Sequence, residues 1–143
     1  MEQYIGTKMV QAEPCIGVKK DPVTGDVIMQ DGYRVVYQDG YESWSPKEVF
    51  EEAYRPTDGM SFGLAIEAAK KGKKIARRGW NGKGQYVELA SNISYIAPDS
   101  SIMNPNHEAI GNKALAFCGT SGVQLGWLAS QADMLADDWE IVE

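Results

Sequence analysis

Two kinds of hydrophobic spacing divide the chain. Between residues 4 and 44, apolar and polar positions alternate over short runs separated by turn residues, which is typical of β-strands. After residue 60, apolar positions instead recur at the three- and four-residue spacing of an amphipathic helix: Phe62, Ala65, Ile66 and Ala69. The stretch from Arg55 to Gly59 holds Pro, Asp and Gly between the two patterns. We therefore predict a small strand-rich N-terminal module over residues 1–56 and a main domain over residues 57–143.

The N-terminal module is predicted to consist of strands closed by a short helix. Residues 4–13 alternate as a strand, and residues 33–37 and 41–44 pair across an Asp-Gly turn. Ser45 is expected to cap a helix that ends near Ala53, because Pro and Glu follow it at positions that favour a helix start. This arrangement resembles a small half-open barrel. We expect its aromatic residues to form core rather than a site: Tyr33, Tyr37, Tyr41 and Trp44.

The main domain is predicted to be one helix packed on an antiparallel sheet. The helix begins after Ser61, a favourable N-cap, and ends at Gly72. On its outer side, Glu67 and Lys71 have the spacing of an ion pair. Strand patterns follow at residues 74–77, 85–90, 113–118, 123–129 and 139–142, with a long polar connection over 91–112 and a short helical turn over 130–136. The predicted fold class is therefore α+β.

Composition indicates a packed protein without membrane contact. Hydrophobic residues make up 43% of the 143 residues, which is enough for a core. No run approaches the roughly 18–20 apolar residues of a membrane span, and the first residues carry no apolar secretory signal. Cys15 and Cys118 are far apart, so we expect free thiols in a reducing cytoplasm.

The charge distribution favours a small anionic ligand over a nucleic acid. The net charge is −6, yet seven of the fourteen basic residues lie between Lys70 and Lys83, and no Asp or Glu lies between Glu67 and Glu88. The rest of the chain carries seven basic residues against twenty acidic ones, a net charge of −13. An acidic body repels a DNA or RNA polymer, whereas a local positive site suits a small anion.

The sequence lacks the usual groups of a catalytic or metal site. His107 is the only histidine and lies in a loop composition, where we expect it to be solvated. Neither a nucleophile motif nor closely spaced Cys and His residues accompany it, so we expect no enzyme, no cofactor and no metal. Asp133, Asp137 and Asp138 could hold a hard cation, but their spacing favours the solvated acidic face of a short helix.

The first candidate binding segment spans residues 73–84. It brings together residue types that nucleotide capture uses: Arg77, Arg78, Gly79, Trp80, Asn81 and Gly82. Arginine pairs with phosphate, glycine lets a ligand approach the backbone, tryptophan stacks on a base, and asparagine reads base or ribose edges. Strand alternation, however, sends Arg77 and Arg78 to opposite faces, and Trp80 could simply cover the sheet edge. The residues alone leave both interpretations open.

The second candidate segment spans residues 126–139. Trp127 and Trp139 are large apolar residues, and we expect Trp139 to lie in the core. Ser130 and Gln131 stand at a strand-to-helix junction, where they could either cap the turn or hydrogen-bond a ligand. Trp127, Ser130 and Gln131 therefore join the first segment as candidate ligand contacts.

Two motifs resemble a known phage family. MSFGLAIEAAKKGKKIARRGWNGKG and WLASQADMLADDWEIV flank residues 60–143 and resemble the second type of Thoeris anti-defence protein. The preceding segment YRVVYQDGYESWSPKEVFEEAYRP is similar to an extension often fused ahead of this domain in phage and prophage proteins. The resemblance implies a non-enzymatic sponge, acting in the cytoplasm of the infected bacterial host, that holds cyclic nucleotide immune signals intact.

The ligands that the resemblance implies are chiefly glycocyclic ADP-ribose and, in some members, cyclic di- or trinucleotides of the CBASS type. It also implies a homotetramer with pockets between subunits. Trp80 in the RGWNG motif is the residue most directly assigned to the ligand, followed by Asn81 and the neighbouring arginines. Because Trp80 is expected in a turn outside the core, Trp80→Ala should weaken binding with little loss of fold. The alternatives are a virion-associated or interaction protein without a nucleotide ligand, and a hydrolase that degrades the signal.

Overall fold

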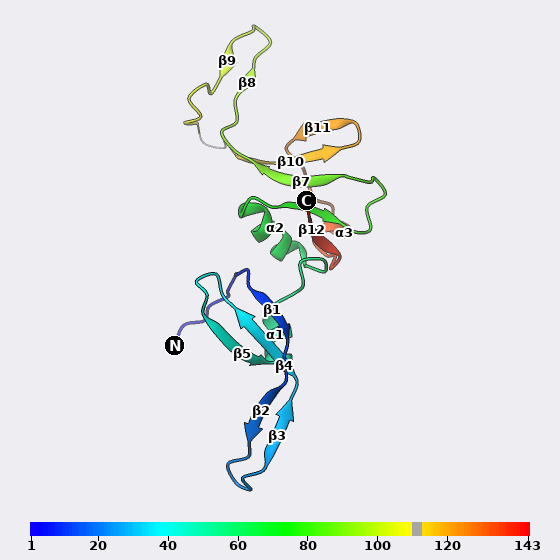
Figure 1. Ribbon diagram of the computed structural model, residues 1–143. Coiled ribbons are helices and arrows are strands. Elements are labelled where there is room, and N and C mark those ends of the chain that lie inside the picture. Colours follow the sequence, from blue (N-terminus) through cyan, green and yellow to red (C-terminus); the bar gives the residue numbers. More distant parts are fainter. Residues whose placement is uncertain (110–112) are drawn as a thin grey trace. The chain divides into compact units, whose positions relative to one another are not determined.

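The computed structural model describes residues 1–109 and 113–143 and divides into two compact units, Met1–Arg55 and Pro56–Glu143 (Figure 1). The described part of the chain contains antiparallel sheets and three helices, so the predicted α+β class is confirmed. None of these helices has the length and apolar character needed to cross a membrane. Cys15 and Cys118 are both partly buried thiols.

The N-terminal unit contains a three-stranded sheet and a separate hairpin. Its elements are β1 (Gln11–Pro14), β2 (Gly17–Lys20), β3 (Val27–Gln30), β4 (Gly32–Val36), β5 (Glu42–Pro46) and α1 (Lys47–Ala53). The sheet has the order β1-β4-β5, and β2 pairs only with β3. The half-open barrel is therefore wrong, because the hairpin does not extend the sheet. The first strand also begins at Gln11 rather than at residue 4.

Aromatic stacking attaches helix α1 to this sheet. Phe50 stacks on Tyr33 with ring centroids 4.3 Å apart and on Tyr54 at 4.8 Å. The predicted cap is wrong: Ser45 belongs to β5, Pro46 precedes the helix, and no side chain caps its first turn. The start of helix α1 therefore depends on packing rather than on a hydrogen bond from a capping side chain.

The Trp44 side chain contacts separate segments of the N-terminal unit. A Cβ added at Gly17 or Gly32 would overlap the Trp44 ring, so this ring lies directly against both glycine backbones. Its indole N–H donates to the Cys15 carbonyl at 2.8 Å. Val35, 1% exposed, is the only core side chain of this unit. The expected aromatic core is therefore only partly right, because Tyr33 and Tyr37 are half-buried whereas Tyr41 and Trp44 are exposed.

The second unit is a five-stranded antiparallel sheet with one main helix. Its elements are α2 (Phe62–Lys70), β6 (Lys74–Arg77), β7 (Tyr86–Ala90), β8 (Tyr95–Ile96), β9 (Ile102–Met103), β10 (Ala114–Gly119), β11 (Gly122–Leu125), α3 (Gln131–Met134) and β12 (Trp139–Val142). The strand order is β11-β10-β7-β6-β12. The C-terminal strand therefore pairs with β6 and brings the last motif of the chain beside the first.

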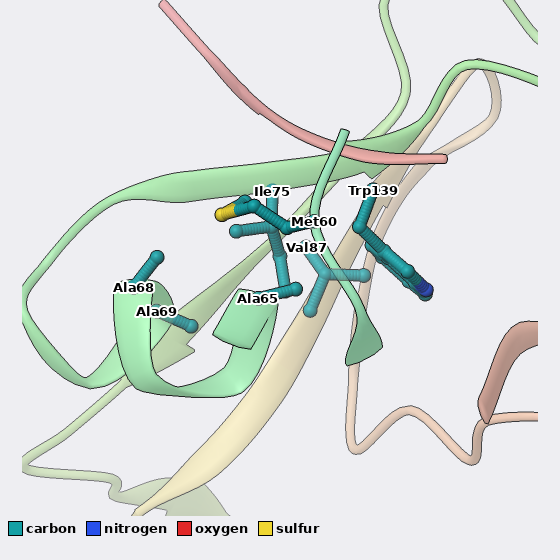
Figure 2. Packing of buried hydrophobic residues seen from close by; sticks show 7 residues of the cluster. All are labelled: Met60, Ala65, Ala68, Ala69, Ile75, Val87 and Trp139. Atoms are coloured by element: carbon teal, nitrogen blue, oxygen red, sulfur yellow. The ribbon is translucent and has the colours of Figure 1, made fainter. Parts of the chain in front are cut away.

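The core of the second unit lies between α2 and the sheet (Figure 2). It combines alanines of the helix with larger side chains of the strands: Met60, Ala65, Ala68, Ala69, Ile75, Val87 and Trp139. Trp139 is fully buried, as predicted. The predicted helix ends are also confirmed, because Ser61 Oγ accepts the Leu64 N–H at 3.4 Å and Gly72 has the positive φ of a C-terminal glycine, 87°.

Three local predictions for this unit need correction. Lys70, not Lys71, pairs with Glu67, at 3.4 Å. The connection predicted over residues 91–112 contains the hairpin β8–β9, although residues 110–112 lie outside the described range. His107 follows this hairpin and is half-buried rather than solvated.

Candidate functional site

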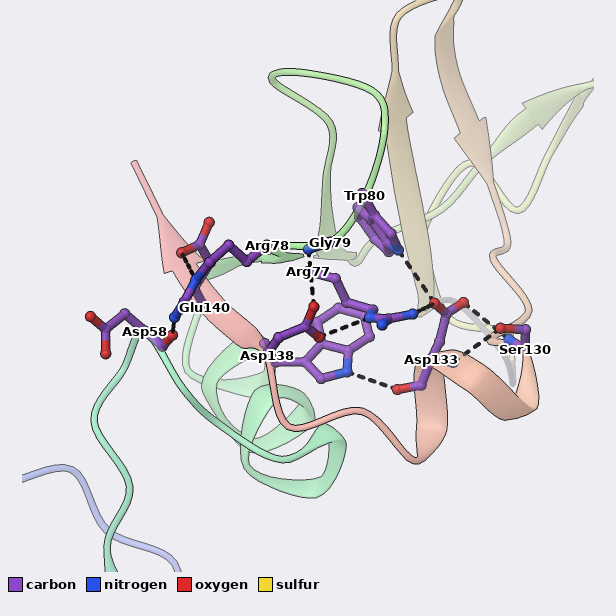
Figure 3. Close-up of polar contacts among 10 residues, drawn as sticks. Asp58, Arg77, Arg78, Gly79, Trp80, Ser130, Asp133, Asp138 and Glu140 are labelled. Atoms are coloured by element: carbon purple, nitrogen blue, oxygen red, sulfur yellow. Dashed lines mark hydrogen bonds and ion pairs between the residues drawn. The ribbon is translucent and has the colours of Figure 1, made fainter.

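Arg77 at the end of β6 is held by two aspartates from the C-terminal segment (Figure 3). Its Nε donates to Asp138 Oδ1 at 2.9 Å, and its Nη1 donates to Asp133 Oδ1 at 3.0 Å. The three side chains are only 21%, 32% and 14% exposed, respectively. The prediction of a solvated acidic face is therefore wrong for Asp133 and Asp138, and right for the exposed Asp137. Arg77 is an internal ion-pair partner, so its charge is already balanced.

The pKa values of these groups follow from the network. Hydrogen bonds to Asp138 and then to Asp133 raise the pKa of Arg77. Partial burial is the largest influence on Asp133 and raises its pKa, but hydrogen bonds from Arg77, Ser130 and Trp80 outweigh it and leave the pKa below its usual value. The pKa of Asp138 is lowered chiefly by its hydrogen bond from Arg77. Both carboxyls are therefore ionised at neutral pH.

Trp80 lies in the turn after β6 and packs on the aromatic part of the core. Its ring centroid is 5.4 Å from that of Trp139, 5.7 Å from Phe117 and 6.0 Å from Trp127. The indole N–H donates to Asp133 Oδ1 at 3.3 Å. The expectation that Trp80 lies outside the core is therefore wrong. The residue is half-buried, so part of its surface still reaches solvent.

The ring contacts of Trp80 all meet edge to face. The planes of Phe117, Trp127 and Trp139 are inclined to it by 67°, 70° and 77°. Within the described ranges, no aromatic ring stacks parallel on Trp80. Three rings therefore pack on this indole at steep angles, and none of the described rings is a parallel stacking partner.

The glycines of the turn lie close to side chains of the protein itself. The Gly79 N–H donates to Asp138 Oδ2 at 3.0 Å, and a Cβ at Gly79 would stand 2.9 Å from that oxygen. A Cβ at Gly82 would overlap only the flexible end of the Gln85 side chain, which can move aside. Contact with Asp138 thus explains Gly79 before any ligand is considered, whereas packing does not require a glycine at position 82.

Comparison with known proteins matches this same unit to a phage family. Residues 60–142 match the model of the Thoeris anti-defense 2-like domain. The chain belongs to this family. It is similar to Thoeris anti-defense 2 of Bacillus phage SP01, with 38% identity over 87 residues that cover 58% of this chain and 94% of that relative. The family resemblance predicted from the two sequence motifs is therefore confirmed.

The two motifs of the Thoeris anti-defense 2-like domain meet at Asp133. Ser130 Oγ accepts the Asp133 N–H at 3.0 Å, while Asp133 Oδ2 accepts the Ser130 N–H at 3.1 Å. This capping box begins α3 and gives Ser130 the capping role, one of its two predicted roles.

Trp127 packs against Trp139 with centroids 6.1 Å apart. Gln131, the first residue of α3, is exposed.

The remaining candidates of the family domain lie outside this network. Arg78 follows the last residue of β6; it donates to the Asp58 carbonyl and lies 3.9 Å from Glu140, so the two arginines have different partners. Asn81 is exposed, and its amide makes no hydrogen bond to the part of the chain that the structure describes. The structure therefore brings five of the predicted residues into one network of contacts: Arg77, Gly79, Trp80, Trp127 and Ser130. Four others lie outside this network: Arg78, Asn81, Gly82 and Gln131.

The positive charge available to an anion comes from other side chains than Arg77. Arg78 keeps 61% of its side chain exposed. Lys71, Lys73 and Lys83 are exposed and form no ion pair with the described residues. An anionic ligand at the turn that follows β6 would therefore meet Arg78 and Lys83, whose side chains are exposed, before it met Arg77.

Asp133 and Asp138 are the site residues that sequence reasoning missed. They lie 56 and 61 residues from Arg77, so no local spacing relates them. A signal for Asp133 was present, because Ser130 and Asp133 have the spacing of a capping pair. No group of His, Cys, Asp and Glu in residues 1–109 or 113–143 is arranged to hold a metal ion.

Proposed function

We propose that the chain is a phage anti-defence protein that binds a cyclic nucleotide immune signal and holds it without cleaving it. Family membership supports the anti-defence role. The observation that supports the ligand class is Trp80: a half-buried indole that three rings contact at steep angles, and on which none of the described rings stacks parallel. A nucleobase has the flat surface that stacks on such a ring, and each stacked base contributes about 1–3 kcal/mol.

Charge near Trp80 supports a phosphate-bearing ligand. Arg78 offers an exposed guanidinium directly beside the turn, and Asn81 and Lys83 are exposed within it. Guanidinium and ammonium groups bind phosphate oxygens, while the amide of Asn81 can read a base or ribose edge. Glycocyclic ADP-ribose carries a base, riboses and a diphosphate, and is the ligand we propose first; cyclic di- and trinucleotides share the same groups.

The state of the acidic side chains supports retention rather than hydrolysis. A general acid or base works best with a pKa near the operating pH. Asp133 and Asp138 instead have lowered pKa values and are hydrogen-bonded to Arg77. They are therefore suited to holding a structure rather than to moving a proton.

A homotetramer with pockets between subunits completes the proposal. The hairpin β8–β9 of the family domain exposes four large apolar side chains to solvent in the single chain: Tyr95, Ile96, Ile102 and Met103. Apolar patches of this kind on a soluble chain mark interaction surfaces. Binding tight enough to compete with an immune effector, at nanomolar Kd, requires about −12 kcal/mol, which an enclosed pocket favours more than an open surface.

The proposal is tested by the chemical state of the released ligand. The full chain is incubated with glycocyclic ADP-ribose, freed of unbound ligand by gel filtration, and heat-denatured before chromatography. We expect the ligand to co-elute with the protein and to be released unchanged. Chain denatured before the incubation is the control. Release of a cleaved product would support the hydrolase instead, and a chain that retains no cyclic nucleotide would rule out sequestration.

A further inference from the structure

Asp133 connects three parts of the family domain through one carboxylate. Oδ1 accepts hydrogen bonds from Arg77 of β6 at 3.0 Å and from the Trp80 indole at 3.3 Å. Oδ2 accepts the backbone N–H of Ser130 at 3.1 Å and so anchors the carboxylate to the start of α3. The side chain is only 14% exposed, and therefore solvent competes little for these bonds.

The position of Trp80 depends on this carboxylate in a way that packing alone does not provide. The contacts with Phe117, Trp127 and Trp139 are apolar and supply no hydrogen-bond acceptor for the indole N–H. The hydrogen bond to Asp133 selects one orientation of the ring, because only that orientation directs the N–H at the carboxylate. Arg77 and Ser130 in turn hold the carboxylate in place.

We propose that Asp133 is a positioning residue of the ligand site, whose carboxylate fixes the Trp80 indole in the orientation that stacks on the base of the ligand. This inference rests on the proposed function, since Trp80 is the residue that contacts the ligand there. It assigns to Asp133 an indirect role: the aspartate acts through Trp80 and is not itself a ligand contact. A preorganised ring binds more tightly because no orientational freedom is lost on binding.

Nuclear magnetic resonance tests the orientation without any ligand. The chain has four tryptophans, so ¹⁵N-labelled full-length protein gives four indole N–H signals, and Trp80→Phe identifies the signal of Trp80. We expect Asp133→Asn to shift the Trp80 signal more than the other three. Asp137→Asn is the matched control, because Asp137 is exposed and close in sequence, and it should leave all four signals in place.

A double-mutant cycle tests whether Asp133 acts through Trp80. In calorimetric titrations with glycocyclic ADP-ribose, we expect Asp133→Asn to weaken binding about tenfold or more, as for loss of a hydrogen bond to a charged group. In the Trp80→Phe background, the same substitution should change affinity by less than about twofold, because the N–H that it orients is absent. Asp137→Asn should bind like the unmodified chain.

The outcomes separate this inference from the proposed function. An unmodified chain that binds no cyclic nucleotide would overturn both. Binding by the unmodified chain, combined with an equal loss from Asp133→Asn in both backgrounds, would overturn the positioning role alone. Should Asp133→Asn fail to fold, Trp80→Phe by itself decides: it keeps a smaller aromatic ring and removes the N–H, and unchanged affinity in this variant would overturn the inference.

Discussion

The two units of the chain bury their side chains in different ways. The unit Pro56–Glu143 closes around Ile75, Val87 and Trp139, all fully buried. The unit Met1–Arg55 has one core side chain, Val35, and otherwise depends on stacked aromatic rings. A deep core gives a half-buried side chain such as Trp80 a close-packed surface to lie against. The candidate site therefore lies in the unit that has the deeper core.

The hairpin β2–β3 adds to this contrast. In the N-terminal unit it exposes Val18, Val27 and Met29 by 71%, 66% and 68%. A two-stranded hairpin without a covering layer is marginal in water. Local opening of the chain is thus expected first in this hairpin and last around Trp139.

The largest expected effect is on the core of the second unit. Trp139→Ala should lower the free energy of unfolding of this unit by about 3–5 kcal/mol, because it removes a fully buried indole from the centre of the cluster. Urea denaturation followed by circular dichroism measures the change. Trp44→Ala in the N-terminal unit is the comparison; since Trp44 is 37% exposed, it should lose less. Equal losses would contradict the difference between the units.

A smaller effect is expected at the core of the N-terminal unit. Val35→Ala should lower the free energy of unfolding of that unit by about 1–3 kcal/mol, because two buried methyl groups are lost. Heteronuclear NMR spectra at increasing urea follow each unit separately. Signals of the second unit should keep their midpoint, and a shared shift of both midpoints would show that the units unfold together.

The helix starts provide a matched pair of still smaller effects. Ser61→Ala should destabilise the second unit by about 1 kcal/mol, since it removes the cap of α2. Ser45→Ala should change the stability of the N-terminal unit very little, because α1 has no side-chain cap. Thermal unfolding of both variants compares them, and similar losses in the two would count against the assigned caps.

The smallest expected difference is in acid sensitivity, because solvent screens part of the Arg77 ion pairs. The pKa values of Asp133 and Asp138 are lowered from 3.8, so their contribution to stability is present above pH 3.8 and is lost as the pH falls through the folded-state values. Acid titration should therefore destabilise the second unit below about pH 3.8. Asp138→Asn should flatten that dependence, and an unchanged profile would show that the pair with Arg77 contributes nothing.

Periodicity predicted the elements of the second unit better than its site. The spacing of Phe62, Ala65 and Ala69 indicated α2, and the burial of Trp139 was expected of a large apolar residue. The Arg77 network could not be predicted, because its partners meet only when β12 pairs with β6. The charge run around Arg77 indicated a positive site, whereas two distant carboxylates neutralise its central residue.

Sequence rules for local structure also failed at positions where tertiary packing determines the conformation. Ser45 has the sequence pattern of a helix cap, yet pairing of β5 with β4 retains it in the strand. The hairpin β8–β9 consists of two strands of two residues each, which are too short to give a hydrophobic alternation. Trp80 was predicted to lie in a turn, but its contacts with the core could not be inferred from turn composition.

Calorimetric titration of the full chain with glycocyclic ADP-ribose, and with a panel of cyclic di- and trinucleotides, tests whether the chain binds a cyclic nucleotide. We expect saturable binding of at least one of these ligands at nanomolar Kd, that is about −12 kcal/mol. Absence of heat with every cyclic nucleotide, at protein concentrations where the spectra show a folded chain, would contradict it.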